Sequence, residues 1–304
     1  RIARQPGLSI TVLGLTEIKK AKLGGLLGVN RGSDLPPRLV EMQYKCGVKG
    51  APTIALVGKG ITFDAGGLSI KTSVGMSTMK CDMGGGGAVL GAMSALPALK
   101  PEVNVKAWVP MTDNMLGGDA TRLGDVLKIR NGKTVEILNT DAEGRLILAD
   151  GLCYASKKIK PDTIIDLATL TGAVIVGLGH ELTGMFATTD ALRDDLLAAG
   201  GVTGEEVWPL PLLDAHKDGM KGKSADLANI GSPAMGAGPS QGAAFLSHFV
   251  ADDREWAHLD IDEIDFKLFN QSPKWLVGFS DVTVLHNHIN HHSTTVHGIM
   301  PVFF

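Results

Sequence analysis

Residues 139–145 read NTDAEGR and place two carboxylates and a guanidinium at alternate positions of the chain. Alternate side chains of an extended backbone share a side, so Asp141, Glu143 and Arg145 can converge on one point. A strand-like run precedes them, and an apolar run with helical spacing follows. Charges so close to an apolar helix are costly unless a metal ion or a partner compensates them. The alternative is an ordinary helix start, with Thr140 or Asp141 as its cap and Glu143 as a first-turn acid.

More charged residues follow the apolar run at residues 53–57, where a strand is expected to end. Together with the first group, they give four carboxylates and one lysine near predicted strand ends: Asp64, Asp82, Asp141, Glu143 and Lys59. If these carboxylates converge, they repel one another unless protons or cations bind them. Two divalent cations would resolve the repulsion, and an oxygen-rich set of ligands suits Zn²⁺, Mn²⁺ or Mg²⁺ better than Cu⁺. Lysine can be a ligand only as the neutral amine.

Four consecutive glycines at residues 84–87 follow Asp82. They can be interpreted as a phosphate cradle, but the GxxxxGK[ST] pattern is absent and no predicted strand directly precedes them. The alternative is that they are packing glycines, which let a helix approach a sheet closely. The sequence favours the second interpretation.

Predicted strands and helices alternate along the chain. The strands are expected at residues 9–13, 53–57, 103–111, 134–138, 163–167 and 257–261. The helices are expected at residues 17–27, 87–96, 145–156, 191–199 and 241–250. Apolar strands interleaved with helices predict an α/β fold with a largely parallel sheet covered on both faces. Ligand sites of such sheets gather at the carboxyl ends of the strands, which is where the charged residues fall.

The composition is typical of a soluble intracellular enzyme. The chain has 304 residues, 44% of them hydrophobic, which is enough for one large domain or two with a sizeable core. A net charge of −3 gives no electrostatic basis for binding nucleic acid or an anionic membrane surface. Three cysteines without a CxxC pair predict no disulfide framework, and no apolar run reaches transmembrane length.

Several sequence blocks carry a resemblance to a known family. VGKGITFDAGG, MKCDMGG and NTDAEGRL, with Lys71 between the first two, resemble the signature blocks of the leucyl aminopeptidase (cytosol aminopeptidase) family in letters, order and spacing. The similarity extends over about residues 6–261 and includes GSDLPPRLVEMQY, LATLTGA, ADLANIG and WAHLDI. It implies a three-layer α/β/α sandwich with a mixed, mostly parallel central sheet. We expect residues 1–261 to form this metalloaminopeptidase catalytic domain, without the family's smaller N-terminal domain.

The resemblance also implies the roles of individual residues. Five match the family's ligands for two divalent metal ions, Mn²⁺ or Zn²⁺: Lys59, Asp64, Asp82, Asp141 and Glu143. Lys71 matches the lysine that polarises the scissile carbonyl, and Arg145 matches the arginine that holds a bicarbonate ion as general base. Four more residues match the substrate pocket: Met79, Thr169, Leu170 and Gly172.

The implied activity is that of a two-metal, leucyl-type aminopeptidase, which hydrolyses the N-terminal peptide bond of peptides through a metal-bridged hydroxide. None of the nine histidines falls in the metal-ligand blocks, which fits a carboxylate-and-lysine site rather than a histidine-based zinc protease. Family members are cytoplasmic homohexamers, so the expected partners are peptides and further copies of the chain, and neither nucleic acid nor a membrane. Asp150, Asp166 and Lys80 are expected to have structural or solvent-facing roles.

The last part of the chain has a different character. Residues 262–301 resemble an internal piece of the LD-carboxypeptidase family of serine peptidases, with Ser280 in the position of the nucleophile. The base and acid that such a serine needs lie further along in that family, so we expect Ser280 to be inert. We therefore predict a foreign tail at residues 262–304. The alternative function is a homologue or fusion product that retains the site but is catalytically impaired, because the end of its domain is replaced.

Overall fold

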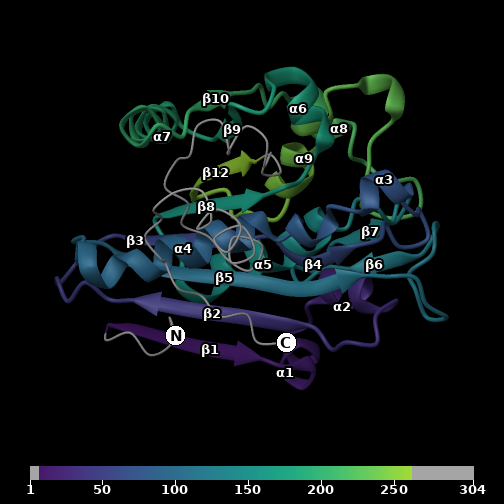
Figure 1. Cartoon of the computed structure of the whole chain (residues 1–304), viewed down its shortest axis with the longest axis horizontal. Coiled ribbons are helices and arrows are strands. Elements are labelled where there is room, and N and C mark those ends of the chain that lie inside the picture. The colour runs from purple at the N-terminus through teal and green to yellow at the C-terminus, as the bar shows by residue number, and fades with distance from the viewer. Residues whose placement is uncertain (1–6, 262–304) are drawn as a thin grey trace, which may run out of the picture.

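The computed structural model describes residues 7–261. Its main sheet contains β1 (Leu8–Leu13), β2 (Arg38–Tyr44), β3 (Thr53–Gly58), β4 (Gly60–Asp64), β5 (Asn104–Asn114), β8 (Thr163–Ala168), β9 (Thr183–Ala187), β10 (Val207–Pro209) and β12 (Glu255–Asp260). The nine strands follow the order β1-β2-β5-β3-β8-β12-β9-β10, with β4 paired to β5 (Figure 1).

The centre of this sheet is parallel. Strands β5, β3, β8 and β12 run in one direction, while β4 and β10 pair in parallel with β5 and β9. Antiparallel pairs lie toward the edges, where β1 pairs with β2, β2 with β5, and β9 with β12. The carboxyl ends of the central strands therefore meet along one edge of the sheet. In open α/β sheets this edge is where ligands bind.

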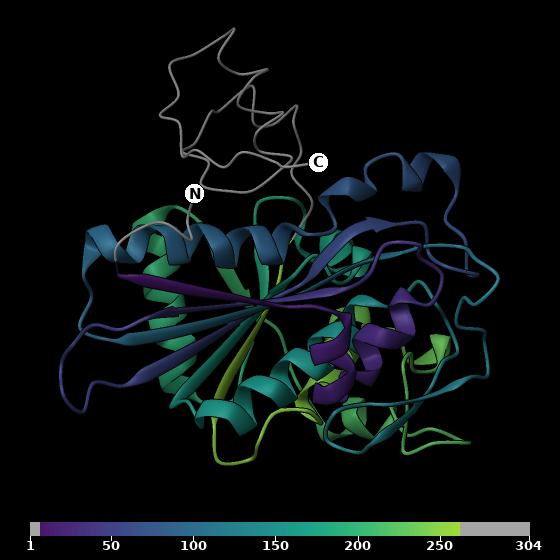
Figure 2. The ribbon, with the colours of Figure 1, turned by 90° about the horizontal axis from the view of Figure 1, so that it is seen from below.

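Helices cover both faces of the sheet. The α-helices are α1 (Leu15–Ala21), α2 (Gly24–Asn30), α3 (Ser73–Met76), α4 (Gly84–Leu99), α5 (Gly144–Ile159), α6 (Gly172–Leu178), α7 (Asp190–Thr203), α8 (Asp214–Asp218) and α9 (Gly238–Ser247). Helix α4 lies on one face, and α2 and α5 lie on the other (Figure 2). None of the helices within residues 7–261 combines the length and the apolar character needed to cross a membrane.

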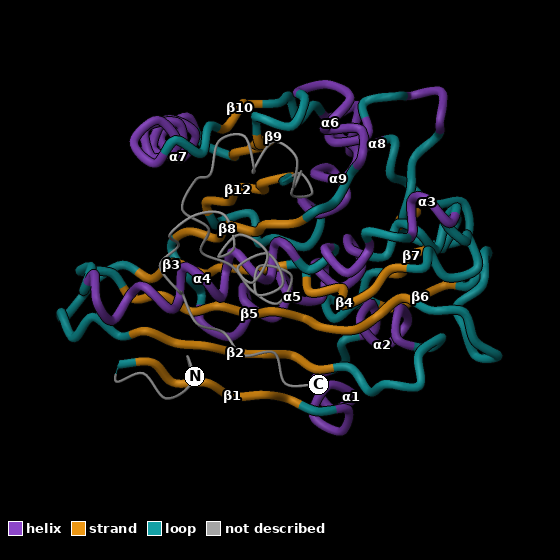
Figure 3. The backbone as a smooth tube through the Cα atoms, in the orientation of Figure 1, coloured by secondary structure: helices purple, strands orange, loops and turns teal. Residues whose placement is uncertain are grey.

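A second, small sheet lies beside the main one. It has the order β11-β7-β6 and is formed by β6 (Val126–Lys128), β7 (Thr134–Glu136) and β11 (Leu227–Ala228). Strand β6 contacts α2 and pairs with β7, and Figure 3 shows β6 beside β7 at one end of the molecule. The chain leaves β7 toward α5, so this sheet supports the start of the segment that carries NTDAEGR.

The two faces of the sheet have separate apolar cores. Trp108 and Val109 are neighbours on β5, yet both are buried, because successive side chains of a strand point to opposite faces. Trp108 belongs to the core that includes side chains of α2, α5 and α9, whereas Val109 belongs to the core that includes those of α4. Burial on both faces explains why the central strands are continuously apolar rather than alternating.

The glycines at the start of α4 let this helix lie directly on the sheet. A Cβ atom on Gly85 would lie 2.0 Å from the carbonyl oxygen of Leu167 on β8, and one on Gly86 would lie 2.9 Å from the carbonyl oxygen of Lys59. The Gly86 N–H donates to that Lys59 carbonyl at 2.7 Å. These are packing glycines, in agreement with the second sequence-based interpretation.

The predicted α/β/α architecture with a mixed, mostly parallel sheet is confirmed. The single helix predicted at residues 17–27 is wrong, because the chain forms α1 and α2 with a break between them. Lys22 ends α1 in the left-handed conformation (φ 58°), and a Cβ on Gly24 would lie 1.9 Å from the Lys128 carbonyl oxygen. The strand predicted at 134–138 ends at Glu136 and belongs to the small sheet. Sequence patterns missed β2, β4, β9 and β10.

Gly85→Ala should lower the free energy of unfolding by roughly 1–3 kcal/mol or more, because the added methyl group meets backbone atoms that cannot move aside. The matched control is Gly177→Ala in α6, where a Cβ would meet nothing within 4 Å. That change should stabilise the protein by about 0.5–1 kcal/mol, as expected for glycine replaced within a helix. Urea denaturation measures both variants. Equal effects of the two substitutions would contradict the close contact of α4 with β8.

Candidate metal centre

The predicted site residues lie in the loops that follow neighbouring strands. Lys59 lies between β3 and β4, Asp64 ends β4, and Asp82 follows a 3-10 turn, Met79–Cys81, that leads into α4. Asp141 and Glu143 lie between β7 and α5, and Arg145 is in the first turn of α5. The pocket residues Thr169 and Leu170 follow β8, and Gly172 begins α6. The fold thus brings together three parts of the chain that are far apart in sequence.

Lys59 is buried between two carboxylates. Its Nζ atom lies 2.6 Å from Asp82 Oδ1 and 3.1 Å from Glu143 Oε1, and it also donates to the carbonyl oxygen of Thr169 at 2.8 Å. Burial alone lowers the pKa of this ammonium group, but the charges of Asp82 and Glu143 outweigh it and raise the pKa above its ordinary value. A cation that binds here must therefore displace a firmly held proton.

Lys71 forms a second, more accessible ion-pair group. Its Nζ atom lies 3.0 Å from Asp64 Oδ2 and 2.7 Å from Asp141 Oδ1. Burial lowers the pKa of Lys71, but hydrogen bonding to Asp141 and the charge of Asp64 outweigh burial and raise the pKa above its ordinary value. Lys71 is therefore protonated. Its side chain is 19% exposed, which leaves the ammonium group within reach of a bound molecule.

The carboxylates between these lysines have the arrangement of a metal site. Asp64, Asp141 and Glu143 each offer an oxygen atom, and these atoms all lie within 4.8 Å of one another. Burial raises the pKa of Glu143 and of Asp82, although Lys59 lowers both. Asp82 Oδ2 and Glu143 Oε2 are buried without a hydrogen-bond partner among the described residues. Buried oxygens of this kind need a cation, and oxygen donors suit divalent ions, so the residues fit the metals implied by the sequence.

Arg145 is a buried cation beside this cluster. It is 7% exposed, and burial lowers its pKa, with the carboxylates of Glu143 and Asp260 opposing that effect. One guanidinium nitrogen donates to the carbonyl oxygen of Asn229 at 2.9 Å. Its Nε atom has no hydrogen-bond partner within the described part of the chain. An unpaired donor on a buried guanidinium is suited to holding a small anion.

All these groups face one cleft with a volume of about 680 Å³. Its lining includes all the residues that the resemblance assigned to metal binding, catalysis or the substrate pocket: Lys59, Asp64, Lys71, Met79, Asp82, Asp141, Glu143, Arg145, Thr169, Leu170 and Gly172. The size is typical of sites for small molecules and short peptides. Apolar side chains line it as well, among them Ile175, Ile230 and Ile261. The cleft therefore combines a charged floor with apolar walls.

Asn229 holds the loop that carries NTDAEGR. Its side-chain oxygen accepts the N–H groups of Leu138 (2.8 Å) and Asn139 (3.3 Å), and its amide nitrogen donates to the carbonyls of Asn139 (2.5 Å) and Ala142 (3.4 Å). These four contacts use the full hydrogen-bonding capacity of an asparagine side chain. Its own carbonyl accepts from Arg145. One buried residue thus fixes the backbone on both sides of Asp141.

Asp260 holds the loop that carries the pocket residues. Its Oδ1 atom accepts the N–H groups of Leu170 and Thr171, each at 3.1 Å, and its Oδ2 atom accepts the Thr171 hydroxyl at 2.6 Å. On the other side of the loop, the Thr169 hydroxyl donates to Asp82 Oδ1 at 2.8 Å. The wall of the cleft is therefore tied both to β12 and to the carboxylate cluster.

The sequence analysis overlooked Asn229 and Asp260. Asp260 ends β12 at the same edge of the sheet as the predicted site. Its position at the carboxyl end of a strand, where ligand sites gather, was a signal that could have identified it. Asn229 lies in the quoted block ADLANIG, but nothing in that pattern indicates its four contacts. Asp150 and Asp166 lie outside the lining of the cleft, as expected: Asp150 accepts backbone N–H groups, and Asp166 binds the side chains of Trp256 and His258. Ser280 and the rest of the predicted tail lie outside the described residues.

Lys59→Met should lower the free energy of unfolding by roughly 3–5 kcal/mol, because it leaves two buried carboxylates without their cation. Asp82 and Glu143 would then hold protons more strongly in the folded protein than in the unfolded chain. The loss of stability should therefore be larger at about pH 8 than at about pH 5.

Urea denaturation with EDTA present measures this effect at both pH values. The control is Lys158→Met, which removes a half-exposed lysine paired with Glu41 and should cost about 1 kcal/mol or less. A loss from Lys59→Met that does not depend on pH would contradict the assigned charge compensation.

Known proteins resemble this chain over most of its length. The family model named "Cytosol aminopeptidase family, catalytic domain" matches residues 1–284 of this chain. A probable cytosol aminopeptidase of Chlorobium limicola is 48% identical over 273 residues, which cover 90% of this chain and 54% of that protein. One from Bdellovibrio bacteriovorus is 48% identical over 266 residues, covering 88% of this chain and 53% of that protein. The chain thus spans about half the length of the curated relatives it matches.

A solved structure of the bottromycin maturation enzyme BotP is 41% identical, with a TM-score of 0.80, and the match covers 86% of this chain and 56% of BotP. A second structure, of BotP in complex with Mn, matches with a TM-score of 0.81. Family model, relatives and solved structures agree over most of the chain, including the segments that supply the cleft. The chain belongs to the cytosol aminopeptidase family.

Proposed function

We propose that this chain is a metal-dependent aminopeptidase that releases apolar residues from the N-termini of peptides. The observation that carries the proposal is the group of Asp64, Asp141 and Glu143, whose oxygens converge at the floor of a cleft with apolar walls. Membership in the cytosol aminopeptidase family supports the same reaction.

Two divalent ions would be held by Lys59, Asp64, Asp82, Asp141 and Glu143. The unpaired oxygens of Asp82 and Glu143 support this assignment, and the Mn bound by the relative BotP supports manganese as one suitable ion. When bound, such ions lower the pKa of a water molecule and polarise a carbonyl oxygen, which provides a nucleophile at neutral pH.

The remaining residues of the cleft bind and orient the peptide. With divalent ions held by the carboxylate cluster, the floor would offer a binding position to the free α-amine of a peptide's N-terminus. The apolar side chains of Met79, Ile230 and Ile261 face the same cleft and suit an apolar first residue. Together these features favour cleavage after the first residue over cleavage within a chain.

Lys71 and Arg145 serve the charge and proton changes of the reaction. The Lys71 ammonium stabilises negative charge that develops on the scissile carbonyl oxygen, because it is cationic and lines the cleft. Arg145, with its unpaired Nε, would hold a bicarbonate ion, and that ion would supply the general base that the cleft otherwise lacks. From its resemblance to the cytosol aminopeptidase family, we also propose that this chain forms a homohexamer in the cytoplasm.

Purified protein supplied with Mn²⁺ or Zn²⁺ should hydrolyse leucine p-nitroanilide, and EDTA should abolish the activity because the metal supplies the nucleophile. Release of nitroaniline, followed by absorbance, measures the rate. A blocked substrate, N-acetyl-leucine p-nitroanilide, is the control and should not be cleaved. A well-folded protein without EDTA-sensitive turnover would support the catalytically impaired homologue instead.

Glu143→Gln and Arg145→Ala should separate metal binding from proton transfer. Loss of a ligand should weaken Mn²⁺ binding by more than about 100-fold, since changes in the residues behind metal ligands already cost about 10–100-fold. Arg145→Ala should retain the metal and lower kcat by about 100-fold or more. Metal content after dialysis and steady-state kinetics measure the two effects, with the exposed Glu205→Gln as control. Equal loss of metal in both variants would refute the assigned roles.

A further inference from the structure

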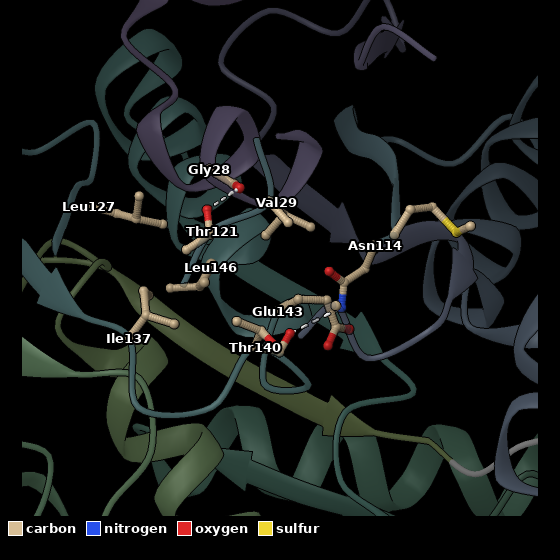
Figure 4. Close-up of a pocket in the computed structure, with 12 residues that line it drawn as sticks. Gly28, Val29, Asn114, Thr121, Leu127, Ile137, Thr140, Glu143 and Leu146 are labelled. Carbon is tan, nitrogen blue, oxygen red and sulfur yellow. Dashed lines mark hydrogen bonds between the residues drawn. The ribbon is translucent and has the colours of Figure 1, made fainter. Parts of the chain in front are cut away.

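Asn114 lies behind the candidate metal centre, on the side away from the cleft. It is the last residue of β5, is 4% exposed, and is absent from the lining of the cleft. Its side-chain nitrogen donates to Asp64 Oδ1 at 2.8 Å and to the carbonyl oxygen of Thr140 at 3.0 Å. Figure 4 shows the Asn114 amide pointing toward Thr140, close to Glu143. Both donor hydrogens of this amide are thus used on the parts of the chain that carry the metal ligands.

These bonds give the two oxygens of Asp64 different surroundings. Oδ1 accepts from Asn114 and from the Gly66 N–H, each at 2.8 Å, whereas Oδ2 lies 3.0 Å from Lys71 Nζ. Because Oδ1 already has two donors, the carboxylate cannot rotate without losing both hydrogen bonds. Oδ2 is therefore the oxygen that Asp64 presents to a cation.

Asn114 also links two distant segments. Asp64 ends β4, while Thr140 lies in the loop that supplies Asp141 and Glu143. One amide group holds the carboxylate of the first segment and the backbone of the second at a common point. The Thr140 hydroxyl strengthens this link by donating to the Gly66 carbonyl at 2.7 Å.

We propose that Asn114 is a positioning residue of the metal centre: its amide fixes Asp64 against the Thr140 backbone, so that ligands from two segments keep the spacing a metal ion requires. This inference rests on the proposed metal-dependent function. It concerns metal affinity rather than the chemistry of peptide cleavage, because Asn114 lines a separate pocket behind Glu143. Partners that orient metal ligands typically contribute about 10–100-fold to metal affinity.

Asn114→Leu is the most informative substitution. Leucine has the same number and branching of side-chain heavy atoms as asparagine, and the pocket beside Asn114 is lined by Val29, Leu127, Ile137 and Leu146, so an apolar side chain suits these surroundings. The substitution removes both donor hydrogens without adding a charge. Asn114→Ala is the second variant, for use if the leucine variant does not fold.

Thr112→Val is the matched control. Thr112 lies two residues earlier on β5, is 5% exposed, and points to the same face of the strand. Its hydroxyl accepts from the side chain of Asn30 and donates to the Asp113 carbonyl. The control thus removes two partly buried hydrogen bonds of a buried side chain, and neither of them reaches a metal ligand.

The experiment measures the dissociation constant of Mn²⁺ alone by chelator competition, and the electron paramagnetic resonance spectrum of the bound Mn²⁺. Melting temperatures are measured with EDTA present. Asn114→Leu should weaken Mn²⁺ binding about 10–100-fold and change the spectrum, whereas Thr112→Val should stay within about twofold of the parent protein.

The outcomes separate this inference from the proposed function. If Asn114→Leu lowers the melting temperature but leaves Mn²⁺ affinity and the spectrum unchanged, Asn114 is only a structural residue and the inference is overturned. The same holds if Thr112→Val weakens Mn²⁺ binding as much as Asn114→Leu does. If the parent protein itself does not bind Mn²⁺, the proposed function fails, and the inference that depends on it fails with it. A variant that binds the metal normally but hydrolyses slowly would place Asn114 in another role and contradict the inference.

Discussion

Compensation of buried negative charge is the constraint on which the rest of this structure depends. Asp82 and Glu143 are almost completely buried, and both would be costly as carboxylates in an apolar environment. Lys59 neutralises them from one side, and Lys71 neutralises Asp64 and Asp141 from the other. The fold thus keeps carboxylates close together, at the spacing that a pair of cations could use.

Glycines at particular positions of the fold let the charged groups and the backbone approach so closely. A Cβ atom on Gly144 would lie 2.5 Å from Lys59 Cε, so the lysine can cross the start of α5 only because residue 144 is glycine. The glycines of α4 likewise allow the segment after Asp82 to approach the ends of β3 and β8. Close backbone packing and the charged cluster are therefore parts of one arrangement.

Sequence reasoning predicted the α/β layers well, because long apolar strands and amphipathic helices leave strong patterns. The residues that it assigned to the site all line the cleft, because charged residues at strand ends and the family's blocks pointed to the same part of the fold. Sequence reasoning missed short strands such as β9 and the edge strand β10, whose few residues carry little periodic signal. It also missed Asn114, Asn229 and Asp260, because their importance lies in which distant backbone groups they contact. Such contacts depend on tertiary structure and not on local spacing.

The parallel order β5-β3-β8-β12 has a consequence for how the protein folds. Parallel neighbours are joined through long crossovers, so the strands that carry the cleft cannot pair until distant parts of the chain have met. Contacts of this kind slow folding, because chain entropy is lost before the contacts form. The carboxylates and their lysines lie in the loops around these strands, so their final spacing requires the central strands to be in register. Until then, Asp141 and Glu143 lie apart from Asp64 and Asp82, so the full set of like charges gathers only together with its lysines.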